Sequence, residues 1–380
     1  MIYKNALITT KDEQFLGYLE VDDKGTIIKI GRGTTNKKGI DCKKLILMPA
    51  FIDSHTHGGY GFSFQEIVNE NWQNKLENYL EKIHQHEGVA AVNITTVTDT
   101  WENILKISKN LLNLKNTSIL NWYLEGPFIS KEKKGAHKEE LIIPIEEKHL
   151  NELNLNKKIK SIIAIAPENN NNELLKKFKK HFYYTIGHSN CYDFSKKFNL
   201  NTFDFFTHFY NGCSSFDHRQ ESLVNTILNN KLSKNFLVEF ISDGIHTTKE
   251  IINFTYKNID KNNLIIISDS LSPKGLENGD YWLGPLEITK KNDIFYLKNQ
   301  NKIAGSGMPY NKILNVFHKA TNCTWSEMVL FSSYNIAKKF KKTNKFGTLK
   351  LNQKGNFVLI DKNFNIKMSF INNKHYTNEN

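Results

Sequence analysis

Eight apolar segments that resemble β-strands recur along this chain of 380 residues, and most are separated by stretches with helical spacing. Two such stretches are residues 100–113 and 173–182. Strands that alternate with helices predict a parallel sheet, and eight such units predict a TIM-like (β/α)₈ barrel, an α/β fold, over residues 48–345. The eight segments are residues 47–59, 89–97, 118–128, 161–168, 182–189, 204–211, 236–246 and 263–270.

The two ends of the chain predict a second, smaller domain. Residues 1–46 contain short runs of alternating apolar residues with Gly and Asp at the breaks, and the chain alternates in the same way from Gly347 onward. A terminal set of strands can complete a sheet that the N-terminus begins. We therefore predict a discontinuous small β-domain made of residues 1–47 and 346–380.

Chemically useful side chains stand at the carboxyl ends of six of the eight predicted strands. Taken singly, each has an ordinary structural explanation, such as a helix cap or a buried histidine. In a barrel, however, all these ends meet at one mouth, which is where such folds place their active sites. The six sets are His55 with His57, Glu125, His188, His208, Asp243 with His246, and Asp269.

A His-x-His pair, His55 and His57, ends the first predicted strand. Alternate side chains of a strand share a face, so this spacing predicts that both imidazoles point the same way, with Asp53 on that face too. A second pair, His84 and His86, lies in a segment with helical spacing, where the two side chains stand about 200° apart and cannot share one ion. We therefore interpret only the first pair as metal ligands.

The residues at this mouth suit metal-dependent hydrolysis. Histidine and carboxylate ligands without thiolates fit zinc, iron, manganese or nickel. A metal held in this way lowers the pKa of its water to about 7 and polarises a carbonyl oxygen. Asp269, at the end of the last strand, is placed to take the proton from that water and later to hand it to a leaving group.

Composition narrows the remaining function classes. The formal net charge is +12, but the lysines are scattered and accompany no nucleic-acid-binding motif, so we expect no nucleic-acid partner; a positive field would instead help to collect a phosphorylated small molecule. The sequence shows neither a signal-peptide pattern nor a membrane-length apolar run, so we expect a cytoplasmic protein without membrane contact. The four cysteines, Cys42, Cys191, Cys213 and Cys323, are far apart, which predicts buried, reduced thiols.

The motifs FIDSHTHGG, LEGPF, KKGAH, GHS, THFYNG, DGIH, SDS and AGS occur in this order between about residues 45 and 310. As a set, they resemble the N-acetylglucosamine-6-phosphate deacetylases of the amidohydrolase superfamily, and the flanking strands match that family's small β-sandwich. The resemblance implies hydrolysis of N-acetyl-D-glucosamine 6-phosphate to D-glucosamine 6-phosphate and acetate. A metal-activated water would attack the amide carbonyl, with Asp269 as general base and then acid.

The resemblance also implies roles for individual residues. Glu125, His188 and His208 would hold one divalent metal, and His55 and His57 a second, so that one or two ions are expected, zinc first and iron, manganese or nickel as alternatives. Family members are homodimers in which the equivalent of Arg219 reaches the neighbouring subunit's substrate. The implied substrate-binding residues are Ala136, His137, Asn211, Gly212, Arg219, Asp243, His246, Ala304, Gly305 and Ser306.

Arg219 is also notable by composition, because it is one of only two arginines in a lysine-rich chain. A planar guanidinium suits phosphate better than an ammonium does, which predicts that Arg219 reads the sugar phosphate.

Some residues depart from the family pattern. Asn211, Gly212 and Cys213 replace the usual Asn-Ala-Met, Ser268, Asp269 and Ser270 replace Thr-Asp-Ala, and Gln220, Glu221 and Ser222 replace Glu-Pro-Gly. The expected ligands and acid/base are intact, so these changes bear on the shape of the phosphate pocket. Two alternatives stay open: a deacetylase for a related amino sugar such as N-acetylgalactosamine 6-phosphate, and a non-catalytic sugar-phosphate or metal-binding protein on the same scaffold.

Overall fold

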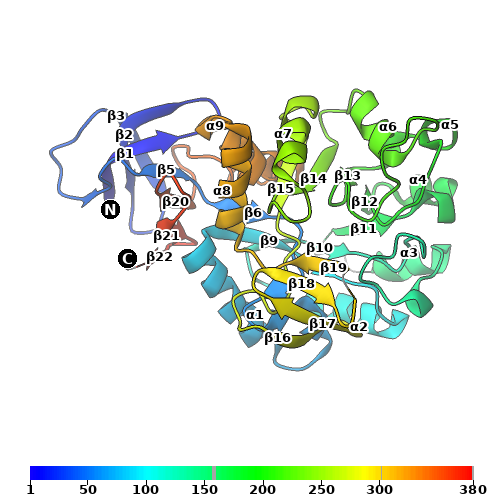
Figure 1. The fold of residues 1–380 in the computed structure, drawn as a ribbon. Coiled ribbons are helices and arrows are strands. Elements are labelled where there is room, and N and C mark those ends of the chain that lie inside the picture. Colours follow the sequence, from blue (N-terminus) through cyan, green and yellow to red (C-terminus); the bar gives the residue numbers. More distant parts are fainter. Residues whose placement is uncertain (156–159, 301, 379–380) are drawn as a thin grey trace.

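A computed structural model describes residues 1–155, 160–300 and 302–378. Eight parallel strands stand side by side in the order β15, β14, β13, β12, β11, β10, β9, β6, which confirms the predicted TIM-like barrel (Figure 1). The strands are β6 (Phe51–Asp53), β9 (Val89–Thr96), β10 (Ile119–Leu124), β11 (Ser161–Ile165), β12 (Tyr183–Ile186), β13 (Phe205–Phe206), β14 (Leu237–Ile241) and β15 (Leu264–Ile267).

Hydrogen bonds just beyond the strands bring the two ends of this sheet together. The N–H of Asp269 donates to the carbonyl of His55 at 2.9 Å. Asp53 accepts bonds from the Ser268 N–H at 3.0 Å and the Ser268 hydroxyl at 2.5 Å. Burial raises the pKa of Asp53 to about 6. Asp53 is therefore part of the barrel closure, and the prediction that it shares a face with His55 and His57 is wrong.

Helices pack around the barrel, and their apolar faces meet the outer faces of the strands in one large core. None of the helices within the described ranges is long and apolar enough to cross a membrane. The α-helices are α1 (Trp72–Lys82), α2 (Trp101–Leu111), α3 (Glu147–Leu153), α4 (Asn172–Phe178), α5 (Phe194–Lys197), α6 (Leu223–Asn229), α7 (Lys249–Asn258), α8 (Tyr310–Thr321), α9 (Trp325–Val329) and α10 (Asn335–Lys339). Shorter helical turns are η1 (Phe64–Val68), η2 (Ile83–Glu87), η3 (Glu139–Leu141), η4 (Pro167–Asn169), η5 (Leu200–Thr202) and η6 (Leu330–Tyr334).

The N- and C-terminal strands form one mixed sheet at one end of the molecule, where both chain ends lie (Figure 1). The strands are β1 (Ile2–Thr9), β2 (Gln14–Val21), β3 (Ile27–Arg32), β4 (Ile40–Asp41), β5 (Ile46–Pro49), β20 (Phe357–Ile360), β21 (Ile366–Ile371) and β22 (Lys374–Thr377). The sheet encloses a core of its own. A bridge between Thr26, just before β3, and Lys354, ahead of β20, joins two distant parts of the sheet. Residues 347–356 contain a turn, two bends and an isolated bridge but no strand, so the strand expected from Gly347 begins only at Phe357.

A four-stranded antiparallel sheet that the sequence did not predict packs against the barrel mouth. It consists of β16 (Gly279–Leu283), β17 (Leu286–Lys291), β18 (Ile294–Leu297) and β19 (Ile303–Ser306). Its Leu283, Ile288 and Phe295 share a small core with Val97, just after β9, and Leu271, just after β15. Residues 304–306, which the resemblance places at the substrate, lie in β19. A short hairpin, β7 (Gly58–Gly59) with β8 (Phe62–Ser63), follows the first barrel strand.

A buried ion pair fixes the segment between β15 and this sheet. The Lys274 ammonium lies 2.7 Å from a carboxylate oxygen of Glu87, and both side chains are almost fully buried. Glu87 also accepts the Tyr60 hydroxyl at 2.9 Å and the Tyr310 N–H at 2.6 Å, so the carboxylate is well satisfied. This pair ties η2, the start of α8 and the segment after Asp269 together.

We expect Lys274→Met to destabilise the protein by about 3–5 kcal/mol, because it leaves the Glu87 carboxylate buried without a counter-charge. Urea unfolding of the two proteins measures this difference. Lys298→Met is the matched control: Lys298 pairs with Asp280 and Glu287 at the surface, so its loss should cost at most about 1 kcal/mol. Equal losses in the two variants would contradict this account of the buried pair.

Candidate active site

The carboxyl ends of the barrel strands converge on the carboxylate of Glu125, which directly follows β10. One oxygen of Glu125, Oε1, lies 3.1 Å from His188 Nε2 and 3.0 Å from His208 Nε2. These two nitrogens are 3.1 Å from each other. The three residues predicted to hold the main metal thus form a tripod of ligand atoms, and all three side chains are buried.

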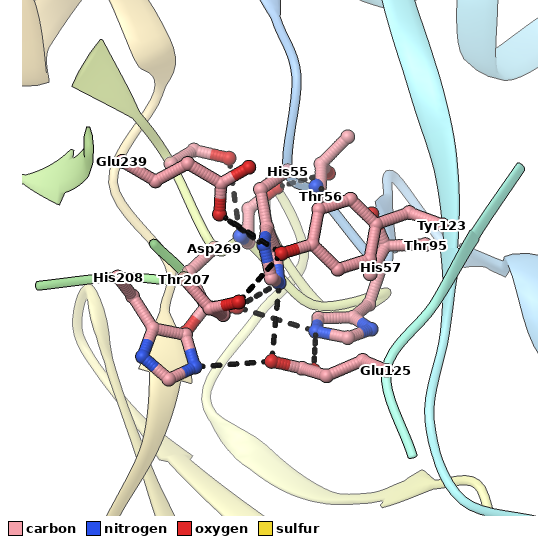
Figure 2. Close-up of polar contacts among 12 residues, drawn as sticks. His55, Thr56, His57, Thr95, Tyr123, Glu125, Thr207, His208, Glu239 and Asp269 are labelled. Carbon is pink, nitrogen blue, oxygen red and sulfur yellow. Dashed lines mark hydrogen bonds and ion pairs between the residues drawn. The ribbon is translucent and has the colours of Figure 1, made fainter. Parts of the chain in front are cut away.

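His55 and His57 also lie against this carboxylate. His57 Nε2 lies 3.1 Å from Glu125 Oε2 and 3.2 Å from Asp269 Oδ1. His55 Nε2 lies 3.4 Å from Glu125 Oε1 and 3.5 Å from Asp269 Oδ1. Figure 2 shows His208, His55 and His57 gathered around Glu125. β6 ends at Asp53, so the loop that follows the strand, and not strand alternation, brings the two imidazoles together.

Hydrogen bonds at Nδ1 of the imidazoles leave the unprotonated Nε2 atoms facing the carboxylates. His188 Nδ1 donates to the Lys133 carbonyl at 2.9 Å, and His208 Nδ1 donates to the Asn211 carbonyl at 3.2 Å. In the neutral imidazole, the Nε2 atom then carries a lone pair. His55 Nε2 is buried without a hydrogen-bond partner. Lone pairs that face carboxylate oxygens fit a divalent cation between them.

The electrostatics of the cluster agree with this fit. Burial disfavours charged imidazoles, but Glu125 and Glu239 raise the pKa of His55 well above its ordinary value, and Asp269 and Glu125 raise that of His57 to about 9. Burial would likewise raise the pKa of Glu125 and of Asp269, but the surrounding histidines hold both below their ordinary values. The cluster therefore requires positive charge, which protons or divalent cations can supply.

Three residues of the cluster have an unusual backbone. His188, His208 and Asp269 have positive φ angles of 48°, 26° and 50°. Residues other than glycine seldom adopt this region, which costs roughly 1–3 kcal/mol each and persists where the surroundings over-determine it. Each residue lies within two or three positions of the end of its strand, where the chain turns to aim the side chain inward.

His137 differs from the other histidines of the cluster. Its Nδ1 accepts the N–H of Thr98 at 3.2 Å and lies 2.8 Å from the Thr98 hydroxyl oxygen. A backbone N–H can only donate, so the proton of the neutral ring is on Nε2, which lies 3.7 Å from Glu125 Oε2. Burial and the nearby His188 hold the pKa of His137 well below its ordinary value. His137 is thus a neutral N–H donor beside the tripod.

A cavity of about 430 Å³ opens from this cluster beneath the β16–β19 sheet. Seven of the predicted substrate-binding residues line it: Ala136, His137, Asn211, Gly212, His246, Ala304 and Gly305. Asp243 lies behind the lining and accepts the His246 Nδ1 proton at 2.7 Å. Ser306 is buried, and its N–H donates to the Asp269 carbonyl at 3.0 Å. Arg219 is exposed on the loop between β13 and α6 and is not part of this lining within one protomer.

Sequence reasoning missed four charged residues of this region. Glu132, Lys133 and Lys302 line the cavity, and Glu239 lies inside the barrel against His55. Lys133 opens the KKGAH motif, so a search for cations next to motif residues would have found it. Glu239 sits in the middle of a strand, where the signal is a lone carboxylate in the otherwise apolar run FLVEFI. Lys302 had no sequence signal that we recognise.

Comparisons with known proteins lead to one family. The sequence profile of the amidohydrolase family matches residues 46–377. N-acetylglucosamine-6-phosphate deacetylase of Caenorhabditis elegans is 30% identical over 361 residues, covering 88% of this chain and 83% of that protein. The protein of the same name from Bacillus subtilis is 26% identical over 389 residues, covering 95% and 93%.

Solved structures are similar over the whole chain. The crystal structure of N-acetylglucosamine-6-phosphate deacetylase from Thermotoga maritima superposes with a TM-score of 0.86 at 29% identity and covers all of both chains. A mutant of the Mycobacterium smegmatis enzyme in complex with N-acetyl-D-glucosamine-6-phosphate gives a TM-score of 0.88 at 19% identity, covering 100% of this chain and 99% of that one. At that identity the second match supports the fold alone.

We expect His188→Ala to lose most bound metal together with hydrolytic activity, because it removes one leg of the tripod. His55→Ala should lose only the second ion and part of the rate. Elemental analysis of protein purified without an affinity tag measures both. His86→Ala, from the other His-x-His pair, is the control and should keep its full metal content. Equal metal content in wild type and His188→Ala would contradict the assignment of His188 as a ligand.

Proposed function

We propose that this chain, a member of the amidohydrolase family and of its N-acetylglucosamine-6-phosphate deacetylases, is a hydrolase. It cleaves the acetamide of N-acetyl-D-glucosamine 6-phosphate. The products are D-glucosamine 6-phosphate and acetate. The observation that carries the proposal is the buried tripod of Glu125, His188 and His208 with Asp269 beside it, at the floor of a cavity large enough for a sugar phosphate.

The donor set fits a divalent cation, because the tripod offers two imidazole nitrogens and a carboxylate oxygen. Cys213, which also lines the cavity, stays a protonated thiol because burial raises its pKa to about 12. A bound cation of this kind lowers the pKa of a water molecule to about 7 and polarises a carbonyl oxygen. Zinc suits these ligands, as do iron, manganese and nickel. His55 and His57 would serve a second ion.

Asp269 would move the proton. Its neighbours hold its pKa below the ordinary value, so the carboxylate is ionised at neutral pH and is ready to accept. It takes a proton from the attacking water as the new C–O bond forms. It then delivers that proton to the amide nitrogen as the C–N bond breaks, so the amine leaves and acetate remains.

His137 would stabilise the carbonyl oxygen as negative charge develops there. The bond from Thr98 leaves the proton on Nε2 and turns it towards the Glu125 side of the cavity. A preorganised donor in a dry site is worth several kcal/mol to such a transition state, on the order of 3 kcal/mol for a single donor. Thr98 thereby fixes the tautomer that the reaction needs.

The remaining lining would orient the sugar phosphate. Asp243 accepts the Nδ1 proton of His246 and so fixes this ring at the cavity wall. Lys133 and Lys302 supply positive charge from within the protomer. Arg219 would complete the phosphate site from the neighbouring subunit of a homodimer, which is consistent with its exposure in one protomer.

The direct test is acetate release from N-acetylglucosamine 6-phosphate, with N-acetylgalactosamine 6-phosphate and unphosphorylated N-acetylglucosamine as comparisons. We expect the first substrate to have the highest kcat/KM. A preference for the galactose epimer would replace the substrate assignment, and release from none of them would contradict the proposed reaction.

Asp269→Asn should lower turnover by about 10²- to 10⁴-fold, because the amide keeps the size of the side chain but loses its basicity. Asparagine also tolerates the positive φ at this position, so the fold should survive. Steady-state kinetics and substrate binding are measured together. Near-normal turnover in this variant would exclude Asp269 as the proton carrier.

Arg219→Lys should raise the KM for N-acetylglucosamine 6-phosphate severalfold, because an ammonium cannot hold phosphate in the bidentate manner of a guanidinium. Hydrolysis of unphosphorylated N-acetylglucosamine should barely change. Arg32→Lys is the matched control, since the only other arginine is exposed on the terminal sheet against Glu13 and Phe15. If Arg219→Lys slows both substrates equally, Arg219 supports the fold or the dimer and does not read phosphate.

A further inference from the structure

Glu239 is a fully buried carboxylate inside the barrel that the proposed reaction does not use. It lies on β14, and its Oε2 atom is 3.0 Å from His55 Nδ1 and 3.2 Å from the Tyr123 hydroxyl (Figure 2). Its other oxygen, Oε1, is buried without a hydrogen-bond partner. Such a half-satisfied charge is expensive to bury, so positive charge nearby has to stabilise it.

Tyr123 and Thr207 hold this carboxylate in place. The Tyr123 hydroxyl contacts Thr207 Oγ1 at 2.8 Å, and the tyrosine ring packs on the ring of His55 with centroids 4.5 Å apart. Tyr123 lies two residues before Glu125, and Thr207 directly precedes His208. The network therefore couples His55 to the strands that carry ligands of the main site.

The bond to Glu239 determines what His55 can do. A carboxylate accepts and cannot donate, so the shared proton belongs on His55 Nδ1 and the lone pair on Nε2. That lone pair faces Glu125 and Asp269 at 3.4 and 3.5 Å, beyond ordinary hydrogen-bond length. A carboxylate behind a histidine ligand also makes the imidazole a stronger base towards a metal.

One divalent cation does not neutralise the charges in this region. Glu125, Asp269 and Glu239 place three negative charges within the same buried cluster. One divalent cation at the tripod leaves a negative charge uncompensated, and this charge lies on the His55 side, where Glu239 is. Further positive charge on the His55 side offsets this deficit, and the geometry of His55 decides what supplies it.

We propose that Glu239 is a positioning residue that orients His55 to bind a second divalent cation. His57 and Glu125 would hold this cation together with His55. The inference rests on the proposed function only in taking the cluster to be a metal site. Glu239 touches neither the ion nor the substrate, and it acts through the orientation, tautomer and basicity of His55.

The test is a titration of the full, metal-free chain with Mn²⁺ alone, followed by electron paramagnetic resonance. Wild type should bind two ions, and the second should convert an isolated Mn²⁺ spectrum into a spin-coupled one. Glu239→Gln keeps the shape but loses the charge, and it should weaken the second ion at least about 10-fold while leaving the first unchanged. Tyr123→Phe removes one bond to Glu239 and should weaken the second ion less, which keeps the test decisive if Glu239→Gln folds poorly.

Asp204→Asn is the matched control, because Asp204 is a largely buried carboxylate at the opposite end of the barrel, bonded to Lys179 and Lys339. It should leave both ions in place. One ion in wild type, unchanged second-ion affinity in Glu239→Gln, or equal weakening of both ions would each overturn the inference. Acetate release by the wild type is measured separately, so failure of the proposed reaction is distinguishable from failure at Glu239.

Discussion

The interaction on which the site depends is the repulsion among acceptor atoms gathered around Glu125. Backbone carbonyls take the Nδ1 protons of His188 and His208, and Glu239 takes that of His55, so three imidazole lone pairs turn towards carboxylate oxygens. Without positive charge between them, this arrangement would be strongly unfavourable in a buried site. The proposed metal site and the proposed catalytic geometry therefore depend on the same set of hydrogen bonds.

The scaffold supports this concentration of polar atoms at some cost. Three residues of the cluster adopt a left-handed backbone, and the barrel closes beside them through Asp53 and Ser268. The β16–β19 sheet covers the mouth through an apolar core, while the Glu87–Lys274 pair anchors the chain that leads to it. Together these contacts keep Asp269 next to the tripod.

Much of this arrangement could be predicted from the sequence, because polar residues at the ends of apolar strands have few alternatives to a common barrel mouth. This reasoning placed the predicted ligands and Asp269 at one mouth, and the structure brings these side chains together. Strand alternation failed for Asp53, since the strand stops there and the histidines lie in the loop beyond it. Residues such as Glu239 and Lys302 depend on contacts between distant segments, and the sheet over the mouth has short strands whose alternation resembles ordinary loop sequence.

Anomalous diffraction from crystals of the protein as purified tests the central claim most directly. The account predicts one strong metal peak bonded to Glu125, His188 and His208, with nitrogen distances of about 2.1 Å, and a second peak beside His55 and His57. Water or direct hydrogen bonds in place of both peaks, after crystals are soaked in zinc, would contradict the claim that this cluster is built to hold divalent metal.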